Sequence, residues 1–104
     1  MLSLKIFDRQ IIHSDHLGLH KNFRELFSER LNDLLEKAPS DASLSTQISK
    51  LKKGYEGMIE IISSRTKFLA NSIKNDPDEL AFDLIDQIYK QILKWRDERI
   101  LLLP

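Results

Sequence analysis

The fold is decided by residues 76–99, DPDELAFDLIDQIYKQILKWRDER, which predict a long amphipathic helix. Asp76 is a suitable N-cap, Pro77 suits the first helical position, and Glu79 lies where a capping box places its carboxylate. Apolar residues then recur every three or four positions: Ala81, Leu84, Ile85, Ile88, Ile92 and Trp95. A helix with such a face must bury it against another element.

A second amphipathic helix is predicted at residues 19–37. Its apolar stripe consists of Phe23, Phe27, Leu31 and Leu34. The helix must end before Pro39, because proline disfavours the α region at the residue that precedes it. The chain therefore offers two helices, each with one apolar face to bury.

Four segments show the alternation of apolar and polar residues that is typical of strands. They are residues 2–6, 44–50, 55–62 and 67–73, and residues 55–62 (YEGMIEII) give the strongest signal. Residues 9–18 mix turn formers with apolar residues, and we expect them to form a connection. Residues 52–54 (Lys-Lys-Gly) and 63–66 are predicted turns.

The predicted order is β-α-β-β-β-α, an α+β fold with two helices packed on one face of a four-stranded sheet. The last three strands follow one another through short turns and must be antiparallel neighbours. A helical crossover makes the first strand parallel to the strand with which it pairs. We expect residues 1–104 to form a single domain, with residues 100–104 as an apolar tail.

The composition limits the function. The chain has no cysteine, which excludes disulfides, thiolate catalysis and cysteine metal sites. Its formal net charge is zero, whereas nucleic-acid binders usually carry a basic excess, so RNA binding would need a local basic patch. No apolar run is long enough to span a membrane, and no secretory signal opens the chain. We expect a cytoplasmic protein without a cofactor.

Three histidines, His13, His16 and His20, are spaced so that they would share one face of a helix, where imidazoles can bind zinc. Ser14, Asp15 and Gly18 predict a turn instead of a continuous helix in this segment. Loop histidines without a metal are therefore the favoured interpretation.

Two pairs of carboxylates could perform acid–base chemistry: Glu56 with Glu60, and Asp83 with Asp86. No nucleophile–base pair, glycine-rich phosphate loop or metal-binding helix motif accompanies them. Solvated faces explain these pairs better, and we expect no enzyme. Tyr89 and Trp95 could stack on bases, but their place at or beside the apolar stripe favours core packing.

Several strings in order along the chain resemble the short ribosome-hibernation factors, also called ribosome-associated inhibitors or sigma-54 modulation proteins. They are FRELFSERLNDLLEK (23–37), SKLKKGYEGMIEI (49–61), FLANSIKND (68–76) and FDLIDQIYKQILK (82–94). None is a catalytic signature. The resemblance comes from the order of apolar positions, turns and charges over nearly the whole length.

The resemblance implies a fold similar to double-stranded-RNA-binding domains. It also implies binding to 16S-type rRNA in the cleft of the small ribosomal subunit, where the protein occludes the mRNA and tRNA sites. In this family, basic residues on the outward sides of both helices contact the RNA. The implied RNA-binding residues are Arg24, Arg30, Lys90 and Lys94, and further charge comes from Lys74, Lys52 and Lys53 near the loops.

An alternative function follows from the departures from this family pattern. Asp33, Gln91 and Glu98 stand where the family usually has lysine. Together with the zero net charge, they suggest a protein-interaction or regulatory module that kept the scaffold and lost strong RNA binding. The apolar tail at residues 100–104 is expected to pack within the domain or to form a homodimer.

Overall fold

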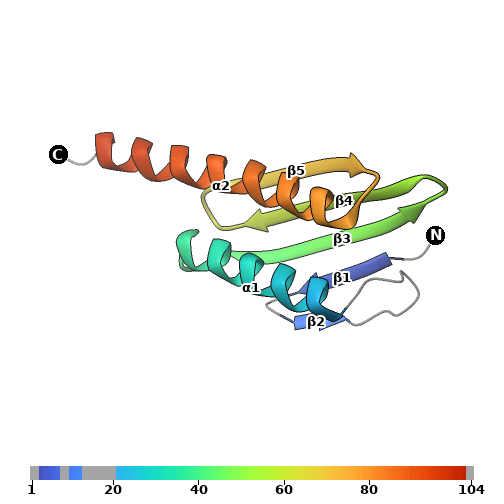
Figure 1. Cartoon of the computed structure of the whole chain (residues 1–104). Helices are drawn as coiled ribbons and strands as arrows, with labels where there is room; N and C mark the ends of the chain where they lie inside the picture. Colours follow the sequence, from blue (N-terminus) through green and yellow to red (C-terminus); the bar gives the residue numbers. More distant parts are fainter. Residues whose placement is uncertain (1–2, 8–9, 13–20, 103–104) are drawn as a thin grey trace.

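The computed structural model describes residues 3–7, 10–12 and 21–102, and the side chains of residues 22–98 (Figure 1). The elements in order are β1 (Ser3–Phe7), β2 (Gln10–Ile12), α1 (Lys21–Lys37), β3 (Ser43–Leu51), β4 (Gly54–Ile62), β5 (Lys67–Lys74) and α2 (Pro77–Leu102). The prediction of an α+β chain with two helices and an antiparallel sheet is confirmed.

The described strands form one sheet in the order β2-β1-β3-β4-β5, so the predicted number of four strands is wrong. The additional strand, β2, lies within residues 9–18, which we predicted to be a connection. It pairs with β1 and places Gln10 opposite Phe7. The two isoleucines of β2 suit a strand, but the turn formers on both sides of them hide this signal in the sequence.

The predicted parallel pairing of the first strand is also wrong. β1 runs antiparallel to β3, with Ile6 opposite Thr46. The cause is the pairing of β1 with β2, which reverses the chain before α1. The crossover helix therefore joins β2 to β3, and these two strands run in the same direction on either side of β1.

Both helices lie on the same face of the sheet (Figure 1). The register of β3, β4 and β5 aligns the buried side chains in rows, such as Leu44, Ile61 and Phe68. Against these rows the helices bury Phe27, Leu31 and Leu34 from α1 and Leu80, Leu84, Ile88 and Ile92 from α2. This single apolar layer fixes which sides of the two helices face outward.

Glycine is needed at two positions for steric reasons. Gly54, the first residue of β4, has a φ of 102°, which glycine adopts without strain. Gly57 lies beneath α2, where an added Cβ would be 2.7 Å from Cδ1 of Leu84 and 3.1 Å from Cδ2 of Leu80. Only a residue without a side chain lets α2 approach β4 this closely.

The start of α2 is as predicted and its end is not. Oδ1 of Asp76 accepts a hydrogen bond from the N–H of Asp78 at 2.9 Å, and Pro77 is the first helical residue. The helix continues to Leu102, so residues 100–102 of the predicted tail are helical. Figure 1 shows that this end of α2 runs beyond the sheet.

Candidate nucleic-acid interface

The charges on the two helices are balanced. α1 contains four basic and four acidic residues, and α2 contains four basic and six acidic residues. In α2 four of the six acidic residues precede Tyr89 and all four basic ones follow it, an arrangement that the helix macrodipole stabilises. Acidic and basic residues are thus mixed on both helices, and the predicted RNA-binding residues differ in their surroundings.

Lys90 and Lys94 project from the outward part of α2, and both side chains are exposed. Nζ of Lys90 lies 2.9 Å from Oδ2 of Asp86, one turn earlier on the helix. The hydrogen bond and the charge of Asp86 raise the pKa of Lys90 above its ordinary value. A phosphate that binds Lys90 must therefore compete with this carboxylate.

Arg30 and Arg24 differ in their surroundings although both lie on α1. Arg30 is exposed and lines a groove between the two helices. Arg24 lies nearer the start of the helix and is partly buried. Neither Lys90 nor Lys94 lines that groove, so the four helix cations are spread over separate parts of the surface.

The lysines near the loops gather at one end of the sheet. Lys52 and Lys53 occupy the exposed turn before Gly54. The backbone at Gly54 packs against the backbone of Lys74 and Asn75, so the three lysines belong to one end of the sheet. They form a second group of cations, distinct from Lys90 and Lys94 on α2.

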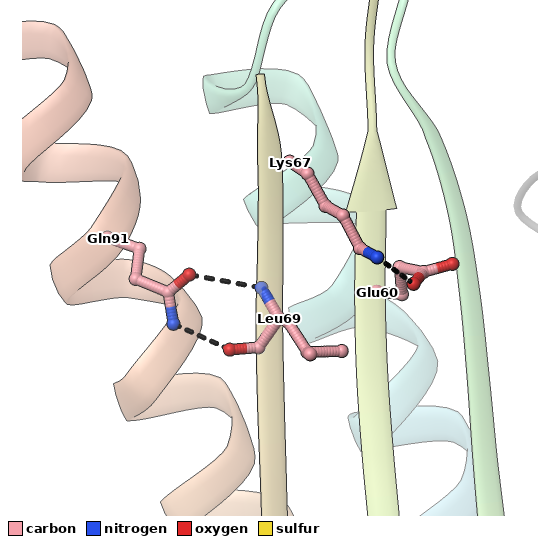
Figure 2. Close-up of polar contacts among 4 residues, drawn as sticks. All are labelled: Glu60, Lys67, Leu69 and Gln91. Carbon is pink, nitrogen blue, oxygen red and sulfur yellow. Dashed lines mark hydrogen bonds and ion pairs between the residues drawn. The ribbon is translucent and has the colours of Figure 1, made fainter.

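Gln91 has a structural role that the sequence did not reveal. Its Oε1 accepts a hydrogen bond from the N–H of Leu69 at 3.0 Å, and its Nε2 donates to the carbonyl of the same residue at 2.8 Å (Figure 2). Leu69 lies in β5, the edge strand of the sheet. The amide thus closes part of an edge that would otherwise offer free backbone groups to another chain.

The same edge is held by two further side chains of α2. Nε2 of Gln87 donates to the carbonyl of Asn71 at 2.9 Å and to Oδ2 of Asp83 at 3.2 Å. The Ser72 hydroxyl donates to the same Asp83 oxygen at 2.5 Å. The hydrogen bond from Ser72 is the largest effect and lowers the pKa of Asp83; burial opposes it, and the Gln87 amide lowers the pKa further.

The groove between α1 and α2 has a volume of about 550 Å³. Its apolar lining includes Phe23, Leu26, Phe27, Leu34, Ala81, Phe82, Ile85 and Tyr89, and its charged lining consists of Arg30, Asp33, Lys37, Asp78 and Asp86. Leu26 and Phe82 remain 54% and 74% exposed there. Exposed apolar side chains within a rim of mixed charge suit contact with a protein surface better than contact with phosphates.

Tyr89 and Trp95, the two α2 residues that could stack on bases, lie on different sides of the helix. Trp95 packs against the core, with its ring 6.1 Å from that of Phe68 in an edge-to-face arrangement. This confirms core packing for Trp95. Tyr89 lies in the groove, 39% exposed, with Nζ of Lys37 5.3 Å from its ring centroid. Its expected core position is therefore wrong.

The two carboxylates of β4 differ in their surroundings. Glu60 pairs with Lys67 across β4 and β5 at 3.1 Å (Figure 2), and Glu56 is exposed. No cluster of metal-ligating side chains occurs among the described residues. His13, His16 and His20 lie outside them. Among the described helices, none has the length and apolar character needed to cross a membrane.

Comparisons with protein-family models, with curated proteins and with solved structures found no match for this chain.

Proposed function

We propose that this protein binds the rRNA of the small ribosomal subunit and silences translation by occluding the mRNA and tRNA sites. The observation that carries the proposal is the order of strings along nearly the whole chain, which resembles the ribosome-hibernation factors. Two helices on one face of an antiparallel sheet suit the proposed likeness to double-stranded-RNA-binding domains. Exposed cations on both helices, Arg30 on α1 and Lys90 and Lys94 on α2, are available to phosphates.

The proposed action is steric and needs no catalytic group. Helix cations and the group of Lys52, Lys53 and Lys74 supply phosphate contacts at separate parts of the surface. Each neutralised phosphate releases about one counterion, so affinity must fall steeply with salt. With about four such contacts, a fourfold rise in salt should weaken binding about a hundredfold.

Co-sedimentation with purified small ribosomal subunits at low and moderate salt tests this function. The wild-type chain should sediment with the subunit at low salt, and the Arg30→Glu/Lys94→Glu variant should remain largely in the supernatant. Arg65→Glu provides a control, because Arg65 is an exposed cation in the turn between β4 and β5 and is not one of the proposed RNA-binding residues. Failure of the wild-type chain to sediment at either salt would refute the proposal.

A second candidate function is a protein-interaction module that has lost strong RNA binding. The specific observation in its favour is the α1–α2 groove, with Leu26 and Phe82 exposed beside Asp33, Asp78 and Asp86. Gln91, which stands where the family usually has lysine, holds the edge of β5 and offers no cation. Ribosome binding that hardly changes with salt, and that survives the double charge reversal, would favour this candidate.

A further inference from the structure

α2 carries a second stripe beside its buried face, and this stripe borders the α1–α2 groove at Phe82, Asp86 and Tyr89. Its members are Phe82, Asp86, Tyr89, Leu93 and Arg96, spaced alternately four and three residues apart. This spacing is that of the a and d positions of a coiled coil, which keep one face of a helix toward a partner helix. The core positions Leu84, Ile88 and Ile92 are fully buried on the neighbouring side of the helix, which packs against the sheet.

The apolar members of this outward stripe are exposed to solvent. Phe82 is 74% exposed, Tyr89 39% and Leu93 38%. Single exposed apolar residues need no explanation, but three in coiled-coil register on one helix indicate a surface for another helix. In the sequence the next position of the stripe is Ile100, and the α2 backbone is helical to Leu102.

We propose that two copies of the chain pair through this stripe, with their α2 helices antiparallel about a two-fold axis near Gln91. In that arrangement Tyr89 of each copy faces Leu93 of the other, and Asp86 faces Arg96. Antiparallel coiled coils bring a positions opposite d positions, and both layers meet that condition. The surface is self-complementary, as a two-fold interface requires.

The chemistry of the facing side chains selects one alignment of the two α2 helices. A shift of seven residues in one direction places Asp86 opposite Tyr89, and a shift in the other direction places Leu93 opposite Arg96. Both shifts bring a charge against an apolar side chain and lose the pairing of Asp86 with Arg96. Only the arrangement centred near Gln91 matches apolar with apolar and acid with base.

The length of α2 fits the α1–α2 groove. Residues 93–102 extend about 15 Å at the rise of an α-helix, and the groove follows α2 from Asp78 to Tyr89, about 17 Å. Figure 1 shows the end of α2 free of the sheet. In the pair, each free end lies over the groove of the other copy. Since Arg30 lines that groove, pairing covers one of the cations of the proposed RNA-binding surface.

A charge-swap experiment on the full chain tests the pairing. Sedimentation velocity over a range from low micromolar to near-millimolar protein should show a monomer–dimer equilibrium for the wild-type chain. Asp86→Arg alone or Arg96→Asp alone places like charges opposite each other, and each should raise the dimer dissociation constant about tenfold or more. The double variant Asp86→Arg/Arg96→Asp restores opposite charges and should dimerise again.

Leu93→Glu should also abolish the dimer, whereas Ile62→Glu should not. Ile62 is a fair control because it is 44% exposed and lies opposite Lys67 on the sheet, away from the stripe. Circular dichroism checks that each variant keeps its fold. A wild-type chain that stays monomeric throughout, equal effects of Leu93→Glu and Ile62→Glu, or a folded double variant that remains monomeric would each overturn the proposal.

Discussion

Replacing Gln91 by alanine tests how the edge of the sheet is protected. The amide makes two hydrogen bonds to the backbone of Leu69, at 3.0 and 2.8 Å. Alanine keeps the helix, but the N–H and the carbonyl of Leu69 in β5 then have only water as a hydrogen-bond partner on this side. At about 0.5–1.5 kcal/mol for each hydrogen bond, and with solvent able to replace part of them, we expect a loss of about 1–2 kcal/mol in the free energy of unfolding.

For a chain of this size that loss corresponds to a fall in Tm of about 5–10 °C. Chemical denaturation followed by circular dichroism measures the free energy directly. The uncovered edge should also raise the tendency to aggregate, which light scattering during heating reports. Lys94→Ala is the matched control, because Lys94 is exposed on the same helix less than one turn further on. Its effect should stay within about 0.5 kcal/mol.

Gln91→Glu tests the donor role of the amide separately. A carboxylate can accept from the N–H of Leu69 but cannot donate to its carbonyl, so the variant should be weakened at neutral pH. Protonation supplies a donor, so the deficit relative to wild type should shrink at acidic pH. If Gln91→Ala is as stable and as soluble as Lys94→Ala, the amide does not protect the edge and the reasoning is wrong.

Three further predictions concern charge, pH and packing. Arg30→Glu/Lys94→Glu should leave Tm within a few degrees of wild type, because both residues are exposed; a much larger fall would show that they are structural. The pKa of Asp83 is lowered in the folded state, chiefly by the hydrogen bond from a serine hydroxyl, so the ionised carboxylate stabilises the fold above about pH 4 and this stability is lost as pH falls through the folded pKa. Asp83→Asn should therefore flatten the plot of unfolding free energy against pH between about pH 5 and 2. An unchanged plot would contradict this. Gly57→Val should lower the free energy of unfolding by at least about 1–3 kcal/mol, because the valine Cβ would lie 2.7 Å from Cδ1 of Leu84. Urea unfolding measures this loss. A variant as stable as the wild type would show that α2 can move away from β4.

Much of the fold follows from local patterns. The N-cap at Asp76, the break before Pro39 and the buried rows of β4 and β5 all come from residue types at fixed spacing, and the structure has them where the sequence predicts. The pairing of β1 does not follow in this way. Its direction depends on a three-residue strand, β2, whose signal is short and surrounded by turn formers.

The surface was harder to predict than the core. Gln91 resembles any solvated helix residue in the sequence, and its bonds to Leu69 exist only because the helix crosses the edge of β5. Tyr89 and Phe82 lie beside the core stripe on a helical projection, yet they face outward. Periodicity shows that a helix has an apolar side, but the packing partner decides where that side ends.

The most direct test of the proposed function is the salt dependence of binding to purified small ribosomal subunits. With about four phosphate contacts, the logarithm of the binding constant should fall with the logarithm of salt with a slope of about −3 to −4. Arg30→Glu/Lys94→Glu should reduce that slope by about 2, and Arg65→Glu should leave it unchanged. No measurable binding of the wild-type chain at low salt, or an equal slope in the wild type and the double variant, would contradict RNA binding through these helices.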